Sequence, residues 1–120
     1  MNHQPLGSVS RERLNGASIV RLEGEIDLHA ADQLNEALSQ SMREAHPVVV
    51  DLAGCQFIDS TGIGAIVRAF RTGQSLHGDT SSVLILAAPV PDVKRVLEQT
   101  LDGLIPVFAS RDDALSASRS

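Results

Sequence analysis

The sequence predicts an α/β domain with a mixed, mainly parallel sheet, and three observations support this fold class. Asn15-Gly16 separates two strand-like runs, which is typical of a hairpin because both residues tolerate positive φ. Residues 48–52 form a β-branched run with little alternation, as in a central strand buried on both faces. Helical and strand-like patterns then alternate to the end of the chain, so we expect the order β-β-α-β-α-β-α-β-α.

The hairpin strands are predicted at residues 8–14 and 17–25. In the second, Val20 and Leu22 fall on one face and charged residues on the other. Such partial alternation predicts an antiparallel strand with one buried face.

A helix is predicted from residue 30 to about residue 44. Its apolar side chains recur at i, i+4 and i+8, at Leu34, Leu38 and Met42. This spacing predicts one buried face and one solvent face.

The second half of the chain is predicted to alternate helices with short strands. The elements are a loop at 53–58, a helix that residues 59–64 open and that runs to about residue 76, a strand at 83–87, a helix starting within 89–92, a strand at 105–108 and a last helix from 110 to about 116. Gly103 is expected to end the third helix, and Ser110 with Asp113 three residues later resembles a capping box.

Length and composition restrict the classes of function. The chain has 120 residues and a net charge of −5, which suits one domain and argues against binding of nucleic acid or an anionic membrane. We expect a domain over residues 8–117, with flexible termini at 1–7 and 118–120. No secretory signal or membrane-length apolar run is visible, so a cytoplasmic location is expected.

Motifs of catalysis and cofactor binding are missing from the sequence. There is no G-x-S-x-G elbow and no P-loop. The single cysteine, Cys55, excludes an intrachain disulfide and a multi-cysteine metal site, and we interpret it as a small apolar loop residue. The histidines are scattered. We therefore expect no enzymatic activity, no catalytic residue, no metal and no cofactor.

Asp51, near the end of a predicted central strand, suggests an alternative class of protein, the receiver domain. An aspartate there could be the phosphate acceptor of a receiver domain, which also needs an acidic cluster after its first strand to hold Mg²⁺. Here that strand ends in Leu14-Asn15-Gly16, and no lysine follows the last strand. The receiver interpretation is therefore rejected.

The most informative segment begins at Ser60, directly before an amphipathic helix. A serine there is expected to be the N-cap, with its hydroxyl accepting a backbone hydrogen bond. Asp59 places a carboxylate beside this hydroxyl, and Thr61 adds a second polar group. Gly62 and Gly64 would leave the first turn bare, so that a partner could approach closely. Unpaired N–H groups at the helix start could also accommodate a phosphate on Ser60.

These residues carry a resemblance to a known family. The segment Phe57-Ile58-Asp59-Ser60-Thr61-Gly62-Ile63-Gly64 is similar to the phosphorylation segment of anti-sigma-factor antagonists of the STAS domain family. The stretches 24–27 (Gly-Glu-Ile-Asp), 48–52 and 93–97 (Val-Lys-Arg-Val-Leu) also fit. The resemblance spans about residues 8–117 and implies a single STAS-like domain, with an N-terminal hairpin and about four helices.

The resemblance implies a partner-switching regulator. In that family the serine matching Ser60 is phosphorylated by an anti-sigma factor that is itself a serine kinase. The unphosphorylated antagonist binds this kinase and releases a sigma factor, and a PP2C-type phosphatase removes the phosphate. The residue matching Asp59 supports phosphorylation and binding, and the one matching Asp27 contributes to the partner surface.

We therefore expect one docking surface, made by the loops around Asp27 and Ser60 and by the exposed side of the second helix. Its predicted residues are Asp27, Asp59, Ser60, Thr61, Gly62 and Arg68, with Arg71 a further candidate for the rim. Thr61 is the alternative acceptor of the phosphate. The protein is expected to be a monomer or a weak dimer. Two other functions remain open, a constitutive STAS scaffold and a regulatory domain that binds a small ligand such as a nucleotide.

Overall fold

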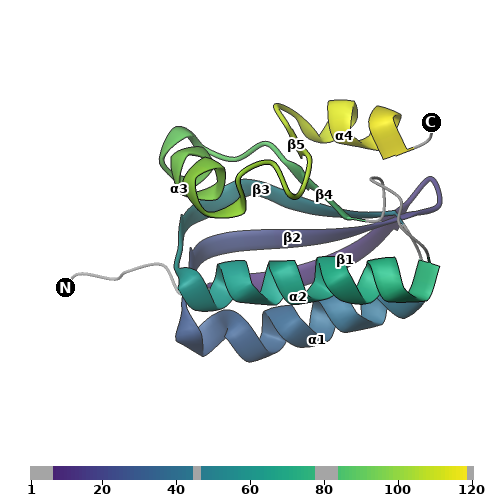
Figure 1. Ribbon diagram of the computed structural model, residues 1–120, viewed down its shortest axis with the longest axis horizontal. Coiled ribbons are helices and arrows are strands. Elements are labelled where there is room, and N and C mark those ends of the chain that lie inside the picture. Colours follow the sequence, from purple (N-terminus) through teal and green to yellow (C-terminus); the bar gives the residue numbers. More distant parts are fainter. Residues whose placement is uncertain (1–6, 45–46, 78–83, 119–120) are drawn as a thin grey trace.

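A five-stranded sheet with helices on both sides forms the core of the molecule (Figure 1). The computed structural model describes residues 7–44, 47–77 and 84–118. The elements are β1 (Ser8–Leu14), β2 (Ala17–Ile26), α1 (Leu28–Glu44), β3 (Val48–Ile58), α2 (Ser60–His77), β4 (Leu84–Ala87), α3 (Pro91–Leu101), β5 (Val107–Phe108) and α4 (Arg111–Ser118). The strand order is β1-β2-β3-β4-β5; β1 and β2 are antiparallel, and the other pairs are parallel. The predicted fold class is confirmed.

The hairpin between β1 and β2 forms where the sequence predicts it. Asn15 and Gly16 have φ angles of 54° and 82°, and Leu14 pairs with Ala17 across the turn. Positive φ at both central positions belongs to the turn type that matches the twist of paired strands.

The two faces of the sheet carry apolar cores of unequal size. The larger core gathers buried side chains of α1, α2 and α3, among them Leu34, Ile66 and Leu97. The smaller core lies under α4, whose Ala114 and Leu115 contact the other face. Figure 1 shows α1 and α2 side by side along the sheet, beginning at the same end, with α4 on the opposite side. Burial of both faces explains the continuous apolar runs of the central strands.

Strand β3 is longer than predicted, and the predicted loop at 53–58 is wrong. Arg21 pairs with Asp51, whereas Glu23 pairs with Gly54; a second shift follows between Gly24 and Glu25. Each shift inserts one extra residue into β3, as a β-bulge does. Bulges break the two-residue alternation by which a strand is recognised in sequence, so these residues resembled a loop.

The other boundaries differ from the prediction by few residues. Helix α1 begins at Leu28 instead of residue 30, and α4 continues to Ser118 instead of 116. Helix α3 ends as predicted near Gly103, with Asp102 and Gly103 at φ angles of 48° and 82°. Of the predicted flexible termini, residues 1–6 and 119–120 lie outside the described residues, as does Val83 of the predicted strand at 83–87. Helices within the described ranges are too short or too polar to cross a bilayer.

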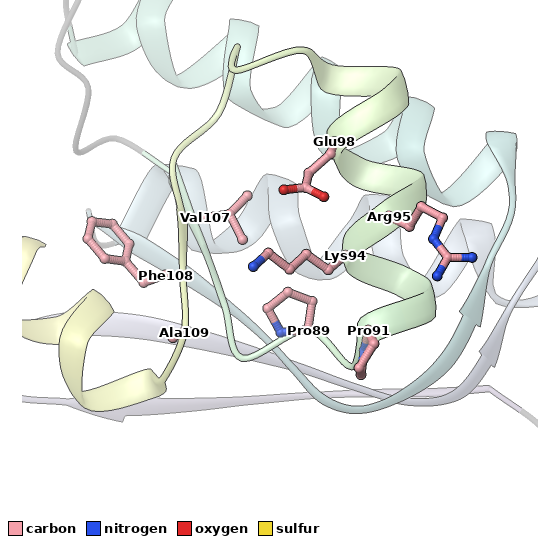
Figure 2. Close-up of a pocket in the computed structure, with 8 residues that line it drawn as sticks. All are labelled: Pro89, Pro91, Lys94, Arg95, Glu98, Val107, Phe108 and Ala109. Carbon is pink, nitrogen blue, oxygen red and sulfur yellow. The ribbon is translucent and has the colours of Figure 1, made fainter.

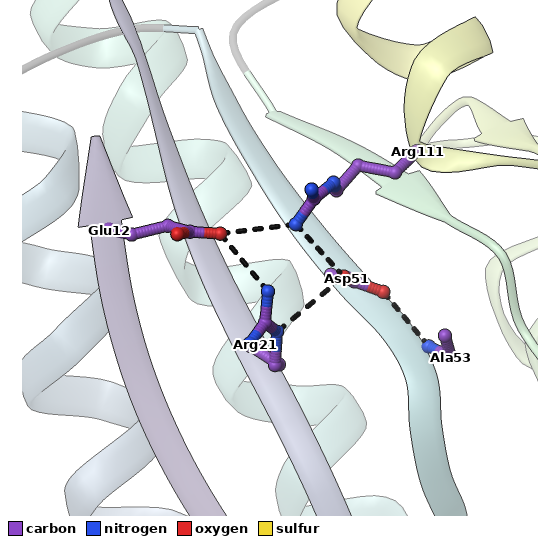
Figure 3. A network of polar contacts seen from close by, with 5 residues as sticks. All are labelled: Glu12, Arg21, Asp51, Ala53 and Arg111. Carbon is purple, nitrogen blue, oxygen red and sulfur yellow. Dashed lines mark hydrogen bonds and ion pairs between the residues drawn. The ribbon is translucent and has the colours of Figure 1, made fainter. Parts of the chain in front are cut away.

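Asp51 belongs to a network of charges that fastens α4 to the sheet (Figure 3). Its Oδ2 lies 3.8 Å from both Arg21 and Arg111, and its Oδ1 accepts a hydrogen bond from the Ala53 N–H at 3.0 Å. Glu12 lies 3.1 Å from both arginines. The network joins β1, β2, β3 and α4. The mostly buried Asp51 carboxylate is thereby compensated by cations, as a buried charge requires.

Candidate functional site

The start of α2 is built by Asp59. Its Oδ1 accepts hydrogen bonds from the N–H groups of Thr61 and Gly62 at 3.0 and 3.1 Å, and from the Thr61 hydroxyl at 2.5 Å. The Asp59 backbone oxygen accepts the Ile63 N–H at 3.0 Å. Asp59 is therefore the N-cap of α2, because it satisfies the N–H groups that a helix start leaves unpaired.

Ser60 is the first residue of α2 and is exposed. The prediction that its hydroxyl caps the helix is wrong, because the neighbouring carboxylate takes that role. Within the described residues, the Ser60 hydroxyl has no hydrogen-bond partner. An exposed hydroxyl without an internal partner is available to another molecule.

The N–H groups at the start of α2 are not free, which corrects a second expectation. A phosphate on Ser60 was expected to use unpaired donors of the first turn. Those of Thr61, Gly62 and Ile63 already donate to Asp59. Since the helix start is neutralised by its own carboxylate, a phosphate on Ser60 would lie beside a like charge.

The carboxylate of Asp59 is held in its ionised form. The hydrogen bond from the Thr61 hydroxyl, with those from the N–H groups of Gly62 and Thr61, lowers the pKa of Asp59 below its ordinary value of 3.8. Hydrogen bonds to the charged form have this effect. The Thr61 hydroxyl donates its hydrogen bond to Asp59, whereas the Ser60 hydroxyl has no hydrogen-bond partner among the described residues.

The two glycines of the first turn have different surroundings. A Cβ on Gly62 would lie 2.8 Å from Ile58 Cγ1 and 3.1 Å from Ile26 Cγ2, so this glycine lets α2 approach the ends of β2 and β3. A Cβ on Gly64 would meet only an Arg68 nitrogen at 3.7 Å. Gly64 leaves the turn bare as predicted, whereas Gly62 is buried and serves packing.

Asp27 occupies the corresponding place at the start of α1. Its Oδ1 accepts a hydrogen bond from the His29 N–H at 3.0 Å, and its backbone oxygen accepts the Ala30 N–H at 3.0 Å. The Asp59 N–H donates to Ile26 O at 3.1 Å. The two capping aspartates therefore follow neighbouring parallel strands at one edge of the sheet, where ligands and partners commonly bind in such folds.

Arg68 is exposed two turns after Ser60. Its Nη2 donates a hydrogen bond to Asn35 Oδ1 at 3.1 Å, which links α2 to α1. Its Nη1 lies nearest to the bare side of Gly64. The guanidinium thus lies near Gly64 and contacts α1.

Cys55 was interpreted as a loop residue and lies instead within β3, fully buried. Burial raises the pKa of its thiol to about 11, although the hydrogen bond to Phe57 O at 3.4 Å acts in the opposite direction. A thiol with this pKa is protonated at neutral pH and is a poor nucleophile.

A groove of about 660 Å³ lies between α3 and β5 (Figure 2). Lys94 and Glu98 project from α3 toward β5, where Val107 lines the opposite wall, and Arg95 points away. None of the predicted docking residues lines this groove. Within the described ranges, no group of three or more His, Cys, Asp or Glu residues could hold a metal ion.

Two apolar residues at this end of the sheet are exposed, which the sequence pattern did not predict. Leu28 follows Asp27, and Phe57 lies two residues before Asp59; the two residues are 69% and 48% exposed. Leu28 stands outside the spacing of Leu34, Leu38 and Met42 that marks the buried face. That mismatch was the signal available in the sequence.

Comparison with known proteins identifies the family. The sequence model of the STAS domain matches residues 8–114. The chain belongs to the STAS domain family. It is 29% identical over 113 residues to the anti-sigma F factor antagonist of Paenibacillus polymyxa, across 90% of this chain and 92% of that protein. The protein from Lysinibacillus sphaericus with the same name is 28% identical over 119 residues, across 98% and 95% of the two chains.

Solved STAS structures have the same fold. The anti-sigma factor antagonist of Mycobacterium paratuberculosis superposes with a TM-score of 0.82 at 26% identity, over 96% of each chain. The unphosphorylated form of the antagonist SpoIIAA gives a TM-score of 0.76 at 23% identity, over 93% of this chain and 96% of that one. These STAS structures contain the sheet and helices that position Asp27 and Ser60 here.

Proposed function

We propose that this STAS protein is an anti-sigma-factor antagonist controlled by phosphorylation of Ser60. In its unphosphorylated form it binds an anti-sigma factor with serine kinase activity and releases a sigma factor. Phosphorylation ends this binding, and a PP2C-type phosphatase restores it. The related sequences named anti-sigma F factor antagonists support the class of function. SpoIIAA, of the same fold, is known in unphosphorylated and phosphorylated forms.

The proposal is based on the different roles of Asp59 and Ser60 at the start of α2. Asp59 caps α2, so the Ser60 hydroxyl is exposed and has no internal partner among the described residues. A kinase can therefore modify Ser60 without removing a cap. The Thr61 hydroxyl donates to Asp59 at 2.5 Å, so modification there would break a contact that holds the helix start. This contrast favours Ser60 as the acceptor.

The phosphate acts by charge. It would add about −1.5 to −2 units beside the ionised Asp59, whose bonds occupy the first N–H groups of α2. At a protein interface such a group is repelled by neighbouring anions and loses hydration. A shift from 99% to 1% bound requires about 5.5 kcal/mol of differential affinity, to which an unpaired interfacial phosphate contributes without refolding.

Ser60 is a substrate in this mechanism. The kinase supplies ATP and Mg²⁺, and this chain supplies the acceptor hydroxyl and the docking surface. Asp27, Asp59, Thr61 and Arg68 are the proposed partner-binding residues, and Gly62 holds the helix start in place. The protein acts in the cytoplasm, without a cofactor of its own, as a monomer or a weak dimer.

Intact-mass spectrometry with the cognate anti-sigma factor and ATP tests the assignment. The wild-type chain is expected to gain one phosphate, Ser60→Ala none, and the matched variant Thr61→Val one. Full modification of Ser60→Ala would overturn the assignment. Complexes that form equally with wild type and with Ser60→Asp would instead indicate a constitutive scaffold.

A further inference from the structure

Two large apolar side chains are exposed at the end of the molecule that carries Ser60. Leu28 is the first residue of α1, directly after Asp27, and Phe57 is the penultimate residue of β3. Glu25 pairs with Phe57 and Ile26 with Ile58, so both apolar residues lie at the edge of the sheet where α1 and α2 begin. Single exposed apolar residues are ordinary, but these two lie at the proposed docking site.

Both side chains stand on backbone that is held in place. The first turn of α1 is capped by Asp27, which accepts the His29 N–H, so the backbone of Leu28 is held in place. Phe57 lines a cavity of about 60 Å³ with Val93 and Val96 of α3, and its carbonyl accepts the Cys55 thiol. A partner that covers these side chains does not have to order the backbone that carries them.

The surroundings of the pair are acidic. Asp27 precedes Leu28 in the chain, Glu25 pairs with Phe57 across the strands, and Asp92 lines the small cavity with Phe57. Among the described residues, none of these three carboxylates forms an ion pair. A partner that covers the apolar pair must therefore bring cationic groups to the rim.

We infer that Leu28 and Phe57 are the apolar anchors of the docking surface, received by an apolar recess bordered by cationic groups on the anti-sigma factor. This inference rests on the proposed function and adds to it the residues that supply the affinity. Ser60 decides whether the complex forms, whereas burial of Leu28 and Phe57 stabilises it once formed. A few buried side chains commonly dominate an interface in this way.

Leu76 is a matched control within the same chain. It is 55% exposed, between Leu28 and Phe57 in exposure. It lies near the other end of α2, 16 residues after Ser60, which is about 24 Å along a helix. Removing its side chain changes exposed apolar area by a similar amount, but far from the proposed surface.

The test is calorimetric titration of the anti-sigma factor that phosphorylates Ser60 with wild type, Leu28→Ala, Phe57→Ala and Leu76→Ala, all unphosphorylated. The first two variants are expected to raise Kd by about tenfold or more, while Leu76→Ala stays near wild type. Thermal unfolding checks each variant. Because Phe57 lines a cavity with residues of α3, Phe57→Leu is included; it should bind better than Phe57→Ala.

Two further outcomes separate this inference from the proposed function. If Leu28→Ala, folded and unphosphorylated, binds as tightly as Leu76→Ala while phosphorylation of Ser60 still releases the wild type, the anchors are wrong and the proposed function stands. If the kinase neither binds nor modifies the wild-type chain, both are overturned.

Discussion

The starts of α2 and α4 each carry a serine, and the hydroxyls of the two serines have different roles. Ser110 precedes α4, and its hydroxyl accepts the Asp113 N–H at 3.0 Å. Ser60 is the first residue of α2, and Asp59 accepts the corresponding N–H groups in its place. A serine that caps a helix has its hydroxyl engaged, whereas a serine behind a capping aspartate presents its hydroxyl to solvent. This difference separates a structural serine from one that can be modified.

A negative charge at each serine should give the largest contrast. Ser60→Asp is expected to weaken binding of the anti-sigma factor by about tenfold or more, because the new carboxylate lies beside Asp59 on the proposed docking surface. Ser110→Asp is expected to bind as the wild type does, since α4 lies on the opposite side of the sheet from α1 and α2. Calorimetric titration measures both; equal weakening by the two variants would break the comparison.

The packing of the first turn of α2 can be tested through its glycines. Gly62→Ala would place a Cβ 2.8 Å from Ile58 Cγ1 and is expected to destabilise the fold, because overpacking costs about 1–3 kcal/mol and helix propensity returns only part of it. Gly64→Ala, with open space around it, is expected to stabilise by up to about 1 kcal/mol. Urea unfolding gives both values; destabilisation by Gly64→Ala would contradict the geometry.

Removing the caps should have a smaller effect. Asp59→Ala and Ser110→Ala are each expected to cost about 1 kcal/mol in the free energy of unfolding. Ser60→Ala is expected to change this free energy by less than about 0.5 kcal/mol, as a surface substitution does. A loss at Ser60 as large as at Ser110 would mean that Ser60 is a cap after all.

The pH dependence of the two caps should differ slightly. The folded pKa of Asp59 is lower than its ordinary value of 3.8, so its contribution to stability is present above that value and is lost as the pH falls through the folded pKa. The difference between wild type and Asp59→Asn is therefore expected to be less than about 1 kcal/mol at neutral pH and to shrink in acid. The cost of Ser110→Ala should not follow this trend, because its cap is uncharged.

Local signals in the sequence were sufficient for most of the fold. Asn15-Gly16 determines a hairpin through its two positive φ angles, and the spacing of Leu34, Leu38 and Met42 determines the buried face of α1. The end of β3 could not be predicted in the same way, because its bulges depend on pairing with β2. Alternation within one strand carries no information about such pairing.

The sequence located the candidate site, but it assigned the capping role to Ser60. In the structure Asp59 caps α2. Ser60 and Asp59 both belong to the residue types that cap helices. Which of them caps α2 depends on where the helical backbone begins, next to the close approach of Gly62 to Ile58 and Ile26. Phe57 likewise lines a cavity with Val93 and Val96 of α3, which are distant from it in the sequence. Motif recognition therefore found the region, and three-dimensional contacts assigned the roles.

The most direct test of the central claim is the affinity of the anti-sigma factor for this chain before and after complete phosphorylation of Ser60. The account predicts that the phosphate raises Kd toward the roughly 10⁴-fold change that a full switch requires, while circular dichroism of the free chain stays unchanged. An unaltered Kd for the fully phosphorylated protein would contradict the claim that the exposed Ser60 hydroxyl controls the partner.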